Sequence, residues 1–244
     1  MVEATDDPRG QGRLRVRFLF DYISPNAYIA WTQIHELAGR RQASVEPVPV
    51  LFAALLAANG LSGPAEIPAK WRWMLRDILC KAARLGIPLH PPESHPFNPL
   101  LTLRASSADL ADDTRKRLID GLFKAIWVDG RRPDDPGVVA DVANKVGIDG
   151  AALVASAQSA DIKQRVRRQT DDALRRGVFG VPTMIVGDEI FWGYDDFAHL
   201  ESFLDGRDTH ERHVLDEWHR VRPSATRRRD RPGSAYVPSR GRTP

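Results

Sequence analysis

The chain has 244 residues, of which 42% are hydrophobic and 27% charged, and its formal net charge is +3. A chain of this length can form one sizeable domain, or a domain that carries a large insertion. No apolar run approaches the roughly 18 residues of a membrane-spanning helix, and residues 2–13 lack an apolar core, so neither a membrane span nor a signal peptide is predicted. The single cysteine, Cys80, fits a reducing compartment, and we expect a cytoplasmic protein without a membrane partner.

The positive charge is concentrated at the C-terminus. Residues 220–244 hold eight arginines against one acid, a charge of +7, so the remainder of the chain carries −4. We therefore expect residues 207–244 to form a basic disordered tail, and residues 1–13 a disordered N-terminus. Such a tail could contact nucleic acid or an acidic surface, but a solvated tail without a nucleic-acid partner is the favoured interpretation.

The first predicted element is a strand over residues 14–20, where apolar residues alternate with arginine and then follow one another directly. A helix is predicted next, to about Ala38. Ser24 is a preferred N-cap residue, and Pro25 suits the first helical position because its missing N–H is not needed there. The Ser24 hydroxyl should therefore lie at the positive end of a helix, which favours a bound anion.

A second strand is predicted over residues 44–50, parallel to the first. Because Pro47 and Pro49 interrupt it, this strand should be short or lie at the edge of a sheet. The sequence then predicts only helices up to Gly177, apart from a proline-rich connection over residues 88–99. These helices are predicted near residues 52–58, 70–85, 100–110, 112–127, 138–146, 151–157 and 161–177.

Strand signals return after these helices. Residues 183–186 and 189–192 are predicted to form a hairpin around Gly187-Asp188, and a last helix, capped by Asp195 or Asp196, ends at Gly206. The order of elements predicts an α/β protein with a thioredoxin-like fold interrupted by an all-helical insertion domain. The thioredoxin-like domain would comprise residues 14–50 and 178–206, and the insertion residues 51–177.

In thioredoxin-like proteins the turn from the first strand into this helix carries a Cys-x-x-Cys redox site, and here Ser24 and Ala27 occupy the two cysteine positions. Disulfide exchange at this turn is therefore excluded, and Cys80 has no second cysteine to pair with. A thiolate brought by a cofactor could still be stabilised by the helix end and the serine hydroxyl. The seven histidines show no metal-ligand spacing, and no metal site is expected.

Four motifs, in this order, resemble 2-hydroxychromene-2-carboxylate isomerase, a DsbA-like family related to the kappa-class glutathione transferases. They are Asp21-Tyr22-Ile23-Ser24-Pro25, Ile67-Pro68-Ala69-Lys70, the stretch from Phe97-Asn98-Pro99-Leu100 to Arg104, and Gly177-Val178-Phe179-Gly180-Val181-Pro182-Thr183. The resemblance covers about residues 14–204. It implies glutathione as cofactor, a small aromatic acid as substrate, and a homodimer, since related proteins are often dimers.

The resemblance also implies a role for individual residues. Ser24 would hydrogen-bond the glutathione sulfur, while the polar residues that reach it from the helical domain would be Asn59 and Lys70. Val181 and Pro182 would form a cis-proline loop that pairs its backbone with the cysteinyl part of glutathione.

The γ-glutamyl end would be held by the turn that contains Tyr194 and Asp195, where an acid suits the ammonium group. Asp196, where the family often has arginine, puts part of this network in doubt. Candidates for lining a pocket for an aromatic acid are Tyr22, Asn26, Arg104 and Trp127, with Arg104 pairing the substrate carboxylate. Asn26 stands where an aromatic residue is common in the family.

Each of these assignments has a simpler structural alternative. Ser24 could serve only as an N-cap, Asn59 before Gly60 is a helix-ending pair, and Lys70 could be a solvated lysine. Buried Tyr and Trp side chains such as Tyr22 and Trp127 are more often part of a core.

The implied reaction is a glutathione-dependent cis-trans isomerisation between 2-hydroxychromene-2-carboxylate and trans-o-hydroxybenzylidenepyruvate in the catabolism of aromatic compounds. A thiolate can add to the conjugated double bond, allow rotation about the resulting single bond, and leave again. Two alternatives remain open: a kappa-like transferase or reductase that consumes glutathione, and a non-catalytic glutathione-binding module.

Overall fold

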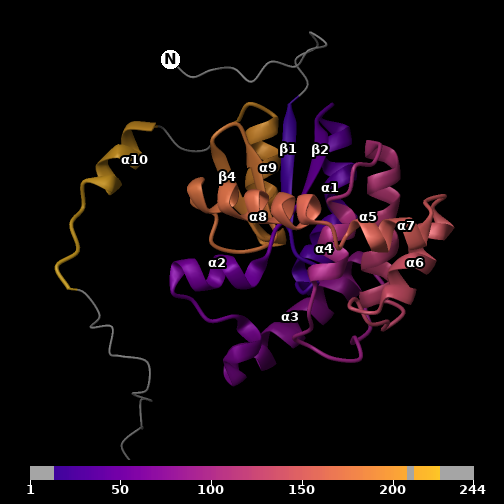
Figure 1. Ribbon diagram of the computed structural model, residues 1–244. Helices are drawn as coiled ribbons and strands as arrows, with labels where there is room; N and C mark the ends of the chain where they lie inside the picture. Colours follow the sequence, from indigo (N-terminus) through magenta and orange to yellow (C-terminus); the bar gives the residue numbers. More distant parts are fainter. Residues whose placement is uncertain (1–13, 208–211, 226–244) are drawn as a thin grey trace, which may run out of the picture. The chain divides into compact units, whose positions relative to one another are not determined.

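The computed structural model describes residues 14–207 and 212–225 (Figure 1). Two compact units divide the chain, Met1–Arg207 and Asp208–Pro244. The predicted disordered N-terminus and most of the predicted disordered tail lie outside the described residues. None of the helices within the described ranges is long and apolar enough to cross a membrane.

The larger unit is built around a four-stranded sheet in the order β2-β1-β3-β4. Strand β1 (Arg15–Phe20) pairs in parallel with β2 (Ser44–Pro49), and in antiparallel with β3 (Thr183–Val186), which forms a hairpin with β4 (Glu189–Trp192). This mixed sheet, with helices inserted between β2 and β3, confirms the predicted thioredoxin-like α/β fold. The proline-containing strand β2 lies at the edge, as its missing N–H groups require.

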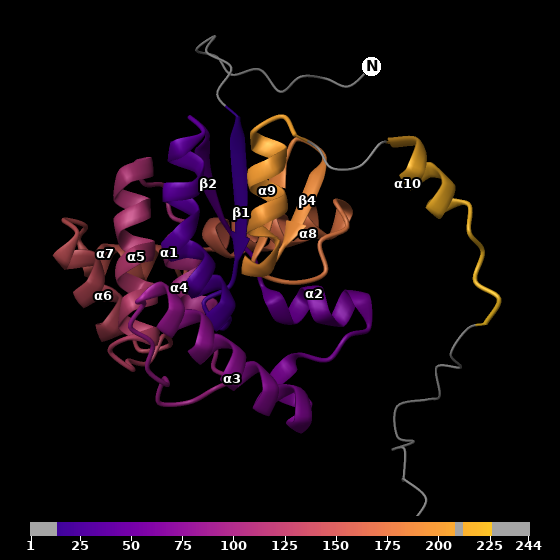
Figure 2. The same ribbon diagram turned by 180° about the vertical axis from the view of Figure 1, so that it is seen from behind.

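Alternation along β1 divides the hydrophobic core between the two faces of the sheet. Val16, Phe18 and Phe20 pack on one face, with α1 (Pro25–Arg40) and α9 (Phe197–Leu204). Leu19 packs on the other face, with α2 (Phe52–Asn59) and α8 (Ala160–Arg175). Figure 1 shows α8 in front of the sheet, and Figure 2, from behind, shows α1 and α9 on the opposite side.

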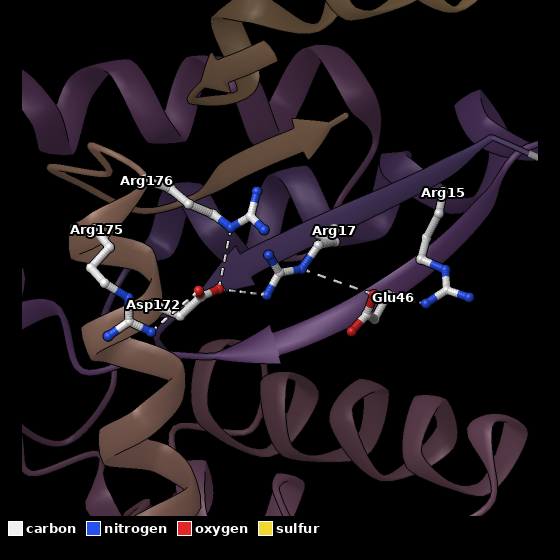
Figure 3. Close-up of polar contacts among 6 residues, drawn as sticks. All are labelled: Arg15, Arg17, Glu46, Asp172, Arg175 and Arg176. Atoms are coloured by element: carbon white, nitrogen blue, oxygen red, sulfur yellow. Dashed lines mark hydrogen bonds and ion pairs between the residues drawn. The ribbon is translucent and has the colours of Figure 1, made fainter. Parts of the chain in front are cut away.

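Arg17 points to the same face as Leu19 and is only 24% exposed. Its guanidinium lies 3.2 Å from Asp172 of α8 and 4.0 Å from Glu46 of β2 (Figure 3). Arg175 and Arg176 also pair with Asp172. Arg17, the less exposed of the two arginines of β1, thus connects the sheet to α8.

The helices between the two halves of the sheet follow the predicted order closely. Besides α2 and α8 they are α3 (Pro68–Leu85), α4 (Leu100–Ser106), α5 (Asp112–Trp127), α6 (Pro136–Lys145) and α7 (Gly150–Ser156). α4 is shorter than predicted, and Ser159 rather than Asp161 caps α8, because the Ser159 hydroxyl accepts the Ile162 N–H at 3.3 Å. α8 contacts β2, so the last helix assigned to the insertion packs on the sheet, and the predicted domain boundaries remain a prediction.

The smaller unit contains a helix that the sequence analysis did not anticipate. Residues 212–219, which that analysis includes in the disordered tail, form α10 (Arg212–His219). Val214, Leu215 and Trp218 recur at the spacing of one helix face, and all three are exposed. The run is only two turns long and lies among charged residues, which is why its periodicity was not evident.

Candidate functional site

The turn from β1 into α1 has the predicted geometry. Ser24 is the N-cap of α1, its Oγ accepts the Ala27 N–H at 3.1 Å, and Pro25 follows at the first helical position. Because the Ser24 oxygen accepts a hydrogen bond, its own O–H remains able to donate one to a ligand. The Ser24 side chain is half-buried, at the positive end of a 16-residue helix.

A fully buried carboxyl group supports this turn. Asp21 accepts the Ile23 N–H at 3.0 Å and the Phe52 N–H at 2.9 Å, while its own backbone C=O accepts the Ser24 N–H at 3.1 Å. Phe52 is the first residue of α2, so Asp21 joins the Ser24 turn to the start of a second helix. Burial raises the pKa of Asp21 to about 7, against the opposing effect of these two backbone hydrogen bonds.

A histidine that the sequence analysis did not assign to the site lies on the other side of the turn. His95 Nε2 is 2.9 Å from the Ile23 C=O, and its ring stacks on Trp71 of α3 at 4.8 Å and 9°. The sequence analysis considers the histidines only for metal-ligand spacing, which they lack. Its place two residues before the motif that begins at Phe97 is the signal that could have found it.

Tyr22 and Trp127 form the base of the turn rather than an open wall. Tyr22 is fully buried and its hydroxyl lies 2.6 Å from the Ser106 Oγ, while the Trp127 Nε1–H donates to the Tyr22 C=O at 2.9 Å. Burial raises the pKa of the Tyr22 phenol. This arrangement corresponds to the simpler alternative of a core role, and contact of either side chain with a substrate remains a prediction.

The other two residues suggested for a substrate pocket are partly accessible. Asn26 is half-buried, and its Oδ1 is buried without a hydrogen-bond partner among the described residues. Arg104 is half-buried on α4 and makes no ion pair within residues 14–207. Both side chains therefore keep polar groups that a ligand could use.

The proline loop lies at the same end of the sheet as the Ser24 turn. The Val181–Pro182 peptide bond is cis, and the Pro182 C=O accepts the Gly193 N–H at 2.9 Å. Since β3 runs antiparallel to β1, with Thr183 opposite Leu19, the start of β3 and the end of β1 meet at one end of the sheet. The Val181 peptide groups make no hydrogen bond in a turn, loop or cap of residues 14–207 and can pair with an extended ligand.

Tyr194 and Asp195 belong to a 3-10 turn, Tyr194–Asp196, that follows β4. The Asp195 carboxylate is 75% exposed and lies 2.7 Å from Lys81 Nζ of α3, which also pairs with Asp77. Asp196 accepts the Trp192 N–H at 3.0 Å and pairs with His199, so it has a local role in place of the arginine common in the family.

Asn59 and Lys70 are both exposed. Asn59 ends α2 and donates through Nδ2 to the Leu55 C=O at 2.8 Å, which is consistent with a structural role at the end of the helix. Lys70 lies in the first turn of α3, next to the Trp71 that stacks on His95. Both helices lie beyond the end of the sheet at which β1 ends (Figures 1 and 2), which is the end that carries the Ser24 turn, and the ligand roles of Asn59 and Lys70 remain predictions.

The polar groups at this end of the sheet fit a bound glutathione. The helix N-terminus and the Ser24 hydroxyl suit a thiolate, the Val181 peptide suits an extended peptide, and Asp195 suits an ammonium group. Cys80, the single cysteine, is exposed on α3 and is not one of these groups.

Comparison with known proteins agrees with this geometry. The DSBA-like thioredoxin domain family matches residues 15–205. The 2-hydroxychromene-2-carboxylate isomerase of Sphingobium xenophagum is 33% identical over 193 residues, which is 78% of this chain and 97% of that protein. Glutathione S-transferase kappa 2 of Caenorhabditis elegans is 26% identical over 208 residues, 78% of this chain and 91% of that protein.

A solved structure of a 2-hydroxychromene-2-carboxylate isomerase superimposes with a TM-score of 0.73 and 28% identity, covering 84% of this chain and 98% of that one. The fold and the matched domain define a DSBA-like thioredoxin protein. Within that class, the chain belongs to the family of the 2-hydroxychromene-2-carboxylate isomerases, with kappa-class glutathione transferases as further relatives.

Proposed function

We propose that this protein is a glutathione-dependent cis-trans isomerase that interconverts 2-hydroxychromene-2-carboxylate and trans-o-hydroxybenzylidenepyruvate, or a closely similar aromatic acid. The observation that carries this proposal is the Ser24 hydroxyl at the N-terminus of α1, in the place of a redox cysteine, with its O–H available. Bound glutathione would supply a thiolate that adds reversibly to the conjugated double bond, so that rotation about that bond becomes possible.

The protein's part in this chemistry is to keep the thiolate charged. A free thiol with a pKa near 8.5 is only about 3% ionised at pH 7. The end of a helix stabilises a negative charge by about 0.3–1 kcal/mol, and a hydrogen bond to a charged group contributes about 1.5–3 kcal/mol. Together these lower the thiol pKa by about 1.3 to 3 units, which makes the thiolate a major species at neutral pH.

The remaining residues would orient the two ligands. The Val181 peptide would pair with the cysteinyl part of glutathione, and Asp195, already beside Lys81, would receive the ammonium group. Lys70 and Asn59 would reach in from α3 and α2. Arg104 would pair the substrate carboxylate, and Asn26 would form the wall next to the sulfur.

The test is a calorimetric titration of glutathione into wild type and Ser24→Ala, at one pH below and one above 7.5. We expect wild type to bind with release of a proton and Ser24→Ala to bind without it. Ser159→Ala is the matched control, because it removes the same kind of N-cap from α8, far from the turn, and should bind as wild type does.

A turnover assay with a hydroxychromene-type substrate then identifies the reaction. Conversion without loss of glutathione supports the isomerase, whereas stoichiometric consumption indicates a transferase or reductase. Binding without any conversion indicates a non-catalytic glutathione-binding module, and no binding to wild type refutes the proposal.

A further inference from the structure

The backbone of Ile23, the residue before Ser24, is held by two titratable side chains. The Ile23 N–H donates to Asp21 Oδ1 at 3.0 Å, and the Ile23 C=O lies 2.9 Å from His95 Nε2. The N–H bound by the Asp21 carboxylate belongs to the Tyr22–Ile23 peptide, whereas the C=O beside His95 belongs to the Ile23–Ser24 peptide. The His95 contact is therefore the side-chain contact that holds the peptide leading directly into Ser24. The Ser24 N–H itself is bound by the Asp21 C=O.

The contact with His95 defines the tautomer of its ring. A carbonyl oxygen only accepts hydrogen bonds, so Nε2 carries the hydrogen and donates it to Ile23. Burial lowers the pKa of His95, which keeps the ring neutral near pH 7 and leaves Nδ1 as an acceptor. Nδ1 is buried and has no partner among the described residues, an arrangement that typically costs about 1–3 kcal/mol.

The imidazole is also fixed in its plane. It stacks on Trp71, meets Phe97 edge-on at 5.9 Å, and lies 5.8 Å from Trp127, whose Nε1–H holds the Tyr22 C=O. His95 therefore links Trp71 of α3 and Trp127 of α5, on which its ring packs, to the Ile23 C=O of the Ser24 turn. A side chain that only filled space would not need to donate a hydrogen bond to the Ile23 C=O, one residue before Ser24.

We propose that His95 is a positioning residue that holds the Ile23–Ser24 peptide so that the Ser24 hydroxyl points at the glutathione sulfur. This inference rests on the proposed function, since it specifies how the thiolate site is oriented. His95 acts through Ser24 rather than on the thiolate itself.

The experiment compares three variants in the full chain. His95→Phe keeps an aromatic ring against Trp71 but loses the donor, and His95→Gln keeps an N–H at a similar reach. His90→Phe is the control, because His90 lies in the same proline-rich segment but its ring contacts the Val128 C=O, at 2.8 Å, and not the Ile23 C=O. The quantity measured is the thiol pKa of bound glutathione, from the ultraviolet absorbance of the thiolate as a function of pH.

We expect His95→Phe to raise that thiol pKa by about one unit or more, as loss of a well-aimed charge-assisted hydrogen bond requires. His95→Gln should restore most of the shift, and His90→Phe should match wild type. In a Ser24→Ala background, His95→Phe should change nothing further, since the two residues then act on one hydrogen bond. A merely structural role of His95 would not give this non-additivity.

Other results would overturn the inference. An unchanged thiol pKa in His95→Phe refutes it, and so does an equal, additive rise in the Ser24→Ala background. If the Phe variant does not fold, His95→Asn replaces it, because the shorter amide cannot reach the Ile23 oxygen. Failure of wild type to bind glutathione would refute the proposed function itself, whereas a lowered thiol pKa that does not depend on His95 refutes only this inference.

Discussion

Replacing Asp21 with asparagine tests the account of the Ser24 turn through the pH dependence of stability. The Asp21 carboxyl has its pKa raised from 3.8 to about 7 by burial, so between these values the folded protein holds a proton that the unfolded chain has lost. Stability therefore falls as pH rises from about 4 to about 7, and the loss persists above that.

The size of the effect follows from the shift. About three pKa units correspond to about 4 kcal/mol, at about 1.4 kcal/mol per unit, and this is an upper value for a buried group. In Asp21→Asn the new side chain would carry no charge, but its amide NH₂ would face one of the two N–H donors, which costs about 1–3 kcal/mol at any pH. We therefore expect Asp21→Asn to be less stable than wild type near pH 4.5 and to become equal or more stable near pH 8.

The assay is urea unfolding of both proteins at these two pH values, followed by circular dichroism. Asp149→Asn is the control, because Asp149 is an exposed N-cap of α7 that accepts the Ala152 N–H at 2.9 Å, and asparagine caps equally well. The difference in free energy of unfolding between Asp21→Asn and wild type should change by several kcal/mol between pH 4.5 and pH 8. A difference that is the same at both values would refute the assignment of a buried, ionisable Asp21.

Two further predictions concern packing. Arg17→Met should lower stability by about 1–3 kcal/mol, because it removes a half-buried partner of Asp172, and the loss should be smaller in an Asp172→Asn background. Gly150→Ala should destabilise by about 1–3 kcal/mol or more, because the new Cβ would overlap the backbone oxygen of Ala140. Gly39→Ala, a helix position with nothing within 4 Å of a Cβ, should instead stabilise by about 0.5–1 kcal/mol, and thermal unfolding of the pair measures the contrast.

Much of the fold was predictable because its signals are local. The cap at Ser24, the two prolines of β2 and the Gly187-Asp188 turn each restrict the backbone in a known way, and each lies where it was expected. The side of the sheet on which a helix lies is not local information. α8 was therefore assigned to the insertion, although residues such as Ala173 and Asp172 pack or pair with the sheet.

The site was predictable only in part, for the same reason. A motif identifies Ser24, but it does not tell which side chain reaches the peptide before it. His95 lies 72 positions away from Ile23 in a segment whose prolines give no periodicity, and only the folded chain shows its Nε2 beside the Ile23 oxygen. Conversely, Tyr22 and Trp127 attract notice as aromatic residues near a motif, yet they are the buried layer on which the turn rests.

The polar groups around Ser24 distinguish this turn from an ordinary helix cap. A cap needs one oxygen, and the Ser24 Oγ supplies it. Stability alone would not favour a buried carboxyl at Asp21, with its pKa raised to about 7, or an imidazole with an unpartnered nitrogen at His95. The Asp21 carboxyl binds the Ile23 N–H and His95 the Ile23 C=O, so the two groups hold the peptides on either side of Ile23, directly before Ser24. Such local departures from the most stable arrangement are expected where geometry matters for function, as the proposed thiolate site at Ser24 would require.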